Sequence, residues 1–325
     1  GRHVGSAQHW SGPGHRLRHR ASRVLLRNIE IQRADQFHRT RGLSLFSALL
    51  DRFLRLHPRW LPTILVIPLL YVAGWITAVP LMLVGLPENQ VSLTGTIFSF
   101  GLFLGMMPRW AALRWQAQSA WCALGIQNPR DNNHPRWWAE LLKGLLVATG
   151  LLSLIVLLTL VGPWGQWLGV INEKNLINSL LLGFGVGCAE ELIFRGWLWN
   201  ELNHGLQARN GALIQAIIFS LVHTRFNIGL LSTLGLLVGL FLLGIVLALM
   251  RHRNNGSLWA SIGLHGGLVS IWFLIDNGLV NFSAETPTWL IGPGGDNPNP
   301  IGGMAGCTLL LALLIAGTFQ RKAIR

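Results

Sequence analysis

Long apolar stretches, separated by short polar ones, run along the chain from about residue 61 to residue 319. Most of them approach the roughly 20 residues with which an α-helix crosses a bilayer. The pattern predicts about eight membrane spans. Their approximate bounds are 61–86, 93–107, 141–161, 176–199, 211–224, 228–250, 257–275 and 301–319. We therefore expect an all-α fold, a polytopic transmembrane helix bundle.

Two segments precede the first span. Residues 1–42 are polar and rich in arginine, and Glu30 and Asp35 are their only acidic residues. This composition is typical of a disordered cytoplasmic tail that is attracted to anionic lipid, although an organelle transit peptide shares it. Over 43–60, apolar residues recur at helical spacing with arginines between them, which predicts an amphipathic helix at the membrane interface. The transmembrane domain is then expected over 61–325.

The composition favours a membrane protein over a soluble one. Of the 325 residues, 51% are hydrophobic and 12% are charged, whereas a soluble domain carries about twice that charged share. The formal net charge of +13 would suit nucleic-acid binding, but the positive-inside rule explains it better. We expect the lipid bilayer as a partner and no nucleic acid. The three cysteines lack the spacing of a disulfide framework or a thiolate metal site.

The charges in the connections predict the orientation of the bundle. With eight spans and a cytoplasmic N-terminus, the arginine-rich connections and the C-terminus all fall inside. Lys174 and Arg225 are the two basic exceptions, placed with the acidic residues on the outer side. Both termini are therefore predicted to be cytoplasmic.

The second span is expected to stop at Pro108. A basic stretch that includes Arg114 follows it, and Trp110, Trp115 and Trp121 are interspersed there. Tryptophan is enriched at the headgroup level of membranes. We therefore predict a helix that lies on the membrane surface after the second span.

The fourth span contains the motif Glu190-Glu191-x-x-x-Arg195. Charge inside a membrane is costly, so such residues indicate a functional site. Consecutive helical residues point about 100° apart, so the two carboxylates face different directions. Glu191 and Arg195 are four residues apart and can pair along one face. A buried ion-pair cluster that only fixes helix packing would explain this pair, but it would not explain Glu190.

Two histidines in later spans are expected at a similar depth. At 1.5 Å per residue, Glu190, His223 and His265 lie roughly 15, 18 and 12 Å from the cytoplasmic ends of their helices. A lone histidine in a bundle is usually a hydrogen-bonded packing residue. Together, however, the three groups can hold a water, with the carboxylate as general base and the histidines as orienter and oxyanion stabiliser. They can alternatively bind a metal as a site of two His and one Glu.

The motif around Glu190, then Phe219-x-x-x-His223, then His265, resembles the CPBP family of intramembrane endopeptidases. These are also called the Abi or CAAX protease and bacteriocin-processing family. The resemblance covers about residues 176–276, the expected catalytic core. It implies a membrane-embedded peptidase of the glutamic type, or a metalloprotease in the older view of the family.

The resemblance also implies roles for single residues. Glu190 would be the catalytic base, and Glu191 would pair with Arg195. His223 would help Glu190 to hold the attacking water, and His265 would stabilise the oxyanion. No cofactor is expected; the alternative is a divalent metal such as zinc, bound by the base and the two histidines. The implied partner is a peptide or protein substrate, which can itself be membrane-anchored.

Val269 departs from the family pattern, which has Asn or Asp four residues after the last histidine. Losing one oxyanion donor typically costs about 100- to 1000-fold in rate. The main interpretation is an endopeptidase that cuts near the cytoplasmic face. The alternative is a weak or inactive relative that acts as an immunity, chaperone or assembly factor. A transporter would also use charges at the midplane, but the inverted repeats typical of transporters are not found in this sequence.

Overall fold

The computed structural model describes residues 47–127, 136–205, 208–295 and 297–322, so the predicted tail over 1–42 lies outside the described residues. The chain divides into two units, 1–62 and 63–325. In the first unit, a helix covers 47–54, and the backbone then turns over 55–59. This helix lies within the segment expected to be interfacial, and its position at a membrane surface stays a prediction.

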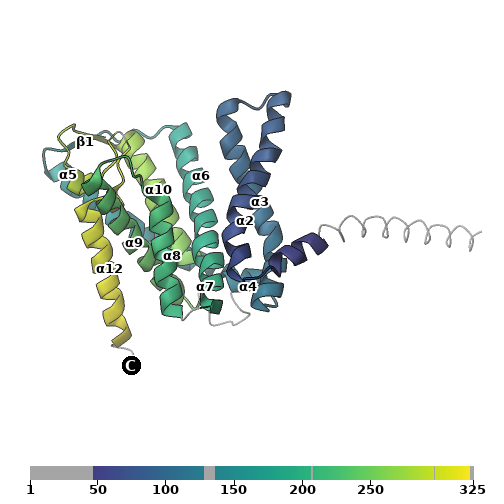
Figure 1. Cartoon of the computed structure of the whole chain (residues 1–325). Helices are drawn as coiled ribbons and strands as arrows, with labels where there is room; N and C mark the ends of the chain where they lie inside the picture. Colours follow the sequence, from purple (N-terminus) through teal and green to yellow (C-terminus); the bar gives the residue numbers. More distant parts are fainter. Residues whose placement is uncertain (1–46, 128–135, 206–207, 296, 323–325) are drawn as a thin grey trace, which may run out of the picture. The chain divides into compact units, whose positions relative to one another are not determined.

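Eleven α-helices follow in the described chain (Figure 1). They are α2 (Trp60–Ala78), α3 (Glu88–Trp110), α4 (Ala120–Leu124), α5 (Trp137–Val161), α6 (Glu173–Glu190), α7 (Trp199–Gly205), α8 (Ala208–His223), α9 (Leu230–Arg253), α10 (Trp259–Leu274), α11 (Thr288–Ile291) and α12 (Met304–Lys322). Three π-helical turns continue α3, α6 and α10: η2 (Ala111–Trp115), η3 (Glu191–Leu198) and η4 (Ile275–Leu279). Two short 3₁₀ segments are η1 (Val79–Val84) and η5 (Pro300–Gly302).

Six of these helical runs are long and apolar enough to cross a membrane, by length and composition. They are Trp60–Val84, Glu88–Trp115, Trp137–Val161, Glu173–Gly205, Leu230–Arg253 and Trp259–Leu279. Two shorter apolar helices, Asn210–His223 and Met304–Gly317, occupy the positions of the predicted fifth and eighth spans. The predicted all-α polytopic bundle is confirmed, and every expected span corresponds to a helix. The fifth helix, α8, has 16 residues and is shorter than a typical crossing, whereas α12 has 19 residues over its full length.

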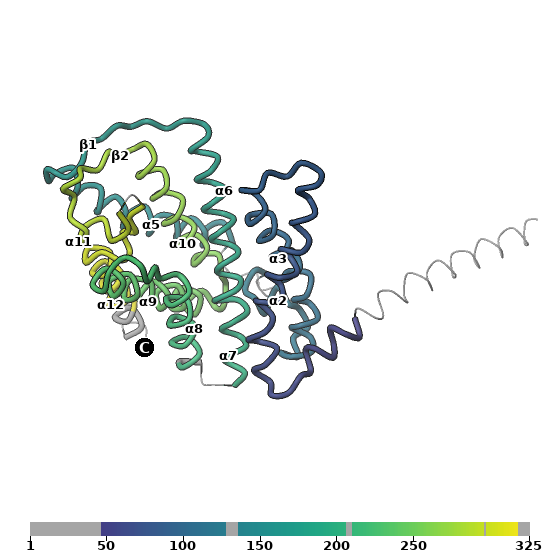
Figure 2. Tube along the Cα trace, turned by 45° about the horizontal axis from the view of Figure 1, so that its top comes forward, coloured from purple at the N-terminus to yellow at the C-terminus, as the bar shows by residue number. Residues whose placement is uncertain are grey.

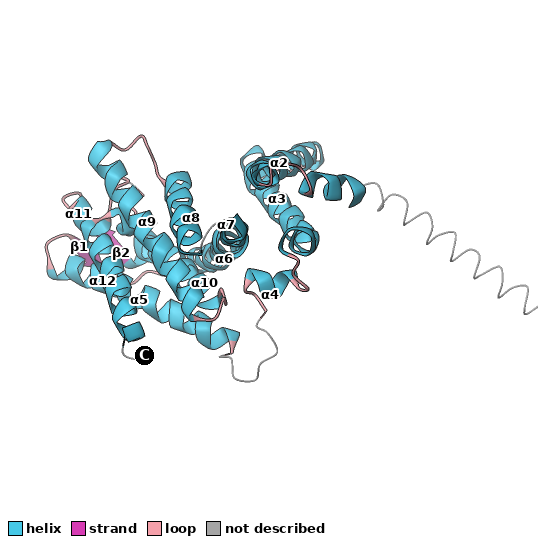
Figure 3. Ribbon diagram, turned by 60° about the horizontal axis from the view of Figure 1, so that its bottom comes forward, coloured by secondary structure: helices cyan, strands magenta, loops and turns pink. Residues whose placement is uncertain are grey.

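A pair of short strands interrupts the otherwise helical architecture. Strand β1 (Gly165–Trp167) runs antiparallel to β2 (Val280–Phe282), with Gln166 opposite Asn281. The strands join the connection after α5 to the one after α10, as Figure 3 shows in magenta. Both connections are extended there, and backbone N–H and C=O groups outside helices need partners. The pairing therefore orders part of the connection between the predicted seventh and eighth spans, residues 276–300.

The helix of the second span does not stop at Pro108, contrary to expectation. It continues through this proline to Trp110 and then, as η2, to Trp115. Both tryptophans are buried, with exposed fractions of 0% and 8%. The predicted headgroup anchoring is therefore wrong for these two residues, whose indole N–H groups instead donate to Glu201.

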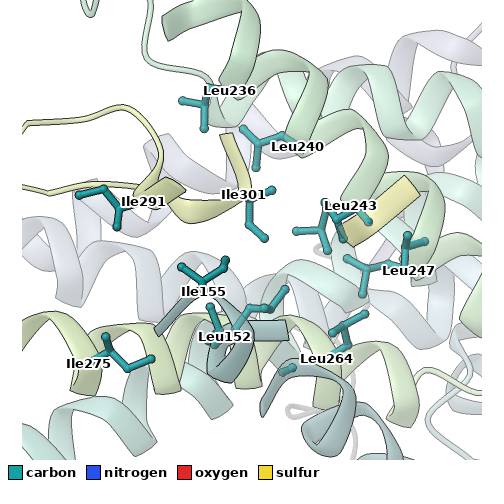
Figure 4. Packing of buried hydrophobic residues seen from close by; sticks show 14 of the residues in the cluster. Leu152, Ile155, Leu236, Leu240, Leu243, Leu247, Leu264, Ile275, Ile291 and Ile301 are labelled. Atoms are coloured by element: carbon teal, nitrogen blue, oxygen red, sulfur yellow. The ribbon is translucent and has the colours of Figure 1, made fainter. Parts of the chain in front are cut away.

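The apolar core of the larger unit lies between α5, α9 and α10. Leu152 of α5, Leu243 of α9 and Leu264 of α10 meet there, as the close view in Figure 4 shows. Within the bundle, α10 packs against both α5 and α6, and α8 packs against α9 (Figures 1 and 2). This arrangement places the end of α6 beside the middle of α10.

Glycines allow α6 and α10 to approach closely. A Cβ atom on Gly266 of α10 would collide with the carbonyl oxygen of Gly183, and one on Gly187 of α6 would crowd the Gly266 backbone. Small residues permit such backbone contact between membrane helices. The close approach positions the end of α6, with its carboxylates, against the face of α10 that carries His265.

Candidate active site

Two adjacent carboxylates sit at a change of helix type. Glu190 is the last residue of α6, and Glu191 is the first residue of η3. Such π-turns are rare and frequently mark functional sites. The side chain of Glu190 is 23% exposed, whereas that of Glu191 is fully buried. The two glutamates therefore have different surroundings, as helical geometry predicts.

Each of the two histidines faces Glu190 with its ring nitrogen Nε2. Oε2 of Glu190 lies 3.0 Å from Nε2 of His223 and 3.6 Å from Nε2 of His265. His223 is the last residue of α8, and His265 lies in the middle of α10. The structure thus brings together three residues that the sequence placed on three different helices at one depth.

The other ring nitrogen of each histidine is engaged by an acceptor. Nδ1 of His223 lies 2.8 Å from the carbonyl oxygen of Phe219. Nδ1 of His265 lies 2.9 Å from Oε1 of Glu191. A carbonyl or carboxylate oxygen only accepts, so both Nδ1 atoms carry their proton. Two acceptors repel each other, and the 3.0 Å between Nε2 of His223 and Oε2 of Glu190 leaves no room for a molecule between them, so these two atoms must share a proton.

Glu191 has two partners, of which the sequence indicated one. Its Oε1 accepts from Nη1 of Arg195 at 3.0 Å, the pairing expected at four residues' separation, and also from Nδ1 of His265. The guanidinium of Arg195 also stacks on the ring of Phe219, 4.1 Å from its centroid. Glu191 therefore links the buried ion pair to a histidine that faces Glu190.

This cluster is incompletely hydrogen-bonded. Oε2 of Glu191 and the Nε and Nη2 atoms of Arg195 are buried without a hydrogen-bond partner among the described residues. A buried polar atom without a partner typically costs about 1–3 kcal/mol. Such atoms in a native structure are often associated with function.

A cavity of about 590 Å³ lies beside Glu190 and the two histidines. Glu190, His223 and His265 line it together with apolar side chains from α5, α6, α9 and α10. Val269 also lines it, so this valine faces the same space as His265, where the family pattern would place a polar side chain. Asn277 lines it too, but its amide N–H donates to the carbonyl of Phe273 at 3.0 Å.

The cavity extends toward one end of the bundle. Its remaining polar lining comes from four residues in the segments that follow α8 and α10: Arg225 after α8, Asp276 in η4, and Asn297 and Asn299 between α11 and η5. These connections are at the opposite end of α9 from Arg253. Under the predicted orientation with cytoplasmic termini, the cavity would face the outer side. The sequence predicted both cytoplasmic termini and a site that is reached from the cytoplasm. The position of the cavity is compatible with only one of these two predictions.

Residues 171–271 match the family model described as Type II CAAX prenyl endopeptidase Rce1-like. The match covers under a third of the chain and includes Glu190, His223 and His265. The match is consistent with the CPBP resemblance and supports a membrane peptidase acting on a peptide or protein substrate. A second family model, described as a domain of unknown function (DUF8676), matches residues 39–119. A comparison with curated proteins found no match.

The matched segment over 171–271 also holds a second buried carboxylate, which the sequence did not single out. Glu201 of α7 accepts two hydrogen bonds from Arg114 at 2.6 and 3.1 Å, and one each from Trp110 and Trp115 at 2.7 Å. Thr63 donates a further hydrogen bond at 2.8 Å. All four donors lie in the range of the second family model, so this Glu201 cluster joins the two matched segments. Arg114 looked like an ordinary arginine of a basic connection, and no local signal indicates its partner.

A third buried charge supports the π-helix η3, which lies in the same matched segment. Arg251, 6% exposed, donates to the carbonyl oxygens of Arg195, Ala123 and Gly256. The sequence indicated only that Arg251 closes a span on the basic side. In the structure it satisfies backbone acceptors at the turn that carries the Glu191–Arg195 pair.

The geometry does not form an evident metal site. Among the residues that the structure describes, no group of three or more His, Cys, Asp or Glu side chains is arranged to hold a metal ion. The three candidate ligands, Glu190, His223 and His265, share one cavity, but their mutual arrangement does not meet that geometry.

Proposed function

We propose that the protein is an intramembrane endopeptidase in which Glu190 activates a water molecule. The observation that carries the proposal is the convergence of both Nε2 atoms on Oε2 of Glu190 at the end of a cavity. A carboxylate beside an imidazole can hold a water and accept its proton as it attacks a carbonyl. The Rce1-like match supports this class of reaction.

In this mechanism His223 orients the water and His265 stabilises the oxyanion. The hydrogen bond from Nδ1 of His223 to Phe219 fixes the ring so that Nε2 points at Glu190. The contact between Nδ1 of His265 and Glu191 holds that ring so that Nε2 faces the cavity beside Glu190, where a proton on Nε2 can be donated to an oxyanion. The proton taken by Glu190 then passes to the leaving amine. Glu191 is thus a positioning residue for His265 as well as the partner of Arg195.

The proposed mechanism uses no metal. A zinc-dependent mechanism would draw on Glu190, His223 and His265, and the two can be separated by experiment. We expect cleavage to survive prolonged chelation, and the purified protein to contain no stoichiometric zinc by elemental analysis. Loss of cleavage on chelation, restored by zinc, would contradict the metal-free mechanism.

The face of the membrane at which the bond is cut depends on the orientation of the bundle. The proposed site is reached past Arg225 and Asn297, whichever face that end occupies. Reporter fusions after Arg253 and near Gly294 would score opposite sides, and they would decide between a cytoplasmic and an outer site. The same side for both would contradict a spanning α10, the helix that lies between these two positions.

A weak or inactive relative is the second candidate, and Val269 favours it. This valine lines the cavity where an amide could donate to the oxyanion, and the nearby amide of Asn277 is already engaged. Such a protein would act as an immunity, chaperone or assembly factor through binding alone. No side chain in the described cavity identifies a prenyl group as part of the ligand.

Proteolysis itself is tested by comparing native membranes that contain the wild type or Glu190→Gln. New peptide termini found by mass spectrometry should appear with the wild type and be absent with the variant. Identical sets of termini for both proteins would support the non-catalytic alternative. The variant should also retain uncut substrates, which can be identified by cross-linking.

A further inference from the structure

Arg225 is a charged residue that the proposed chemistry does not use. It follows His223 by two residues, and it is the only lysine or arginine among the described residues that line the cavity. The charge pattern of the connections also marks it as an exception, a basic residue on the side with the acidic ones. A cation in the wall of a largely apolar cavity suggests an anionic ligand.

The guanidinium of Arg225 is held in place but mostly unpaired. Nη1 donates to the carbonyl oxygen of Asn297 at 3.0 Å, and the backbone carbonyl of Arg225 accepts from Thr233. The residue is half-buried, and no ion pair to it is present among the described residues. A guanidinium has five N–H donors. Its Nε and Nη2 remain available for a planar acceptor.

Asp276 is the one acidic residue besides Glu190 among the described residues that line the cavity. It is also half-buried, and no ion pair joins it to Arg225 in the described structure. The arginine is therefore not neutralised by an ion pair with this aspartate. Its positive charge is available to a molecule in the cavity.

Arg225 lies close along the chain to His223, which faces Glu190. Because Arg225 follows His223 by two residues, their Cα atoms are at most about 7 Å apart. This is the length of about two residues of an extended substrate peptide. A group bound at Arg225 would therefore lie a few residues from a peptide bond held at Glu190. Arginine recognises carboxylates through two parallel hydrogen bonds.

We propose that Arg225 binds a carboxylate of the substrate a few residues from the scissile bond. This inference rests on the proposed peptidase function and deepens it by naming a substrate class. The carboxylate is either the free C-terminus of the substrate or an acidic side chain, since both present the same acceptor. The alternative role for Arg225 is only to hold the backbone at Asn297 over the cavity.

The test uses three synthetic pools of short peptides with the same sequences. One pool has free C-terminal carboxylates, the second has C-terminal amides, and the third has amides with glutamate among the last three positions. Binding to the full chain in detergent is measured by equilibrium dialysis, and cleavage is measured separately. The proteins are the wild type, Arg225→Gln and, as a matched control, Lys174→Gln, because Lys174 is an exposed basic residue at the same end.

We expect the wild type to bind at least one carboxylate-bearing pool about 10-fold more tightly than the amide pool. Arg225→Gln should remove this preference, and Lys174→Gln should keep it. Preference for the first pool alone identifies a C-terminal carboxylate, and preference for the third identifies an acidic side chain. Because the wild-type comparison needs no variant, a folding defect in Arg225→Gln would not obscure the result.

Equal binding of all three pools by the wild type would overturn the proposal. An equal loss for all pools in Arg225→Gln would also overturn it and would favour the loop-holding role. Binding that prefers carboxylates without any cleavage would sustain the role of Arg225 and contradict the peptidase function. Cleavage without that preference would do the reverse.

Discussion

The helical run over Glu173–Gly205 carries two buried acidic clusters that contrast sharply. At Glu201, one carboxylate accepts from an arginine, two tryptophans and a threonine, and both of its oxygens are used. At Glu190 and Glu191, a cavity adjoins the cluster, and buried atoms of Glu191 and Arg195 have no hydrogen-bond partner among the described residues. Both clusters pair an acid with an arginine, but only one leaves capacity for a ligand.

This difference separates a structural ion pair from a reactive site more clearly than burial or charge does. A buried pair is tolerated when further hydrogen bonds satisfy its remaining atoms. Glu201 meets that condition and therefore suits a joint between helices. Glu190 remains close to two imidazoles at the end of an accessible space, which is the condition for proton transfer. The comparison predicts that the same substitution will have opposite consequences in the two places.

Glu190→Gln should have the largest effect on activity. The amide keeps the shape of the side chain but cannot take a proton, so cleavage should fall by about 10²- to 10⁴-fold. The melting temperature should change little, because Glu190 is not part of the buried ion pair with Arg195. Peptide cleavage and thermal unfolding of the purified variant check this. An unfolded variant would mean that Glu190 is structural.

Glu191→Gln should affect both properties. It leaves Arg195 without its charged partner, and breaking a buried pair typically costs about 3–5 kcal/mol. It also replaces the charged acceptor of the hydrogen bond from Nδ1 of His265 with a neutral one, so folded molecules should cleave more slowly. Arg195→Met is the matched control, since it breaks the same pair but leaves the contact to the histidine. Equal activity in the two variants would show that the contact does not position His265.

Glu201→Gln should affect stability without affecting chemistry. Its amide group would face donors from Arg114 and the tryptophans, so the free energy of unfolding should fall by about 3–5 kcal/mol. The fraction that remains folded should cleave at the wild-type rate. Denaturant titration combined with an activity measurement per folded molecule checks this. A large loss of turnover would show that the Glu201 cluster acts on the site.

Val269→Asn should have the smallest effect. The side chain is half-buried and lines the cavity, so an amide there can remain solvated and adds one donor near the oxyanion position. A neutral hydrogen bond is worth about 1 kcal/mol, so turnover should be retained or rise by about 2- to 10-fold. Val269→Leu, which adds no donor, is the control. No cleavage by either the wild type or Val269→Asn would favour an inactive relative.

The sequence determined those features that depend on neighbours along the chain. Apolar length predicted the helices, including the shorter fifth one, and four-residue spacing predicted the pair between Glu191 and Arg195. Depth counted along each helix placed Glu190, His223 and His265 at one level. These inferences succeeded because rise per residue and helical rotation are properties of a single helix.

Only the tertiary structure decided which helices turn toward each other. The contact from His265 to Glu191, the enclosure of Glu201 by Trp110 and Trp115, and the direction of the cavity all depend on packing between helices. A tryptophan in a basic stretch has the same local pattern whether it anchors at a membrane surface or donates to a buried carboxylate. Its partner lies about ninety residues away, and helical spacing carries no information at that separation.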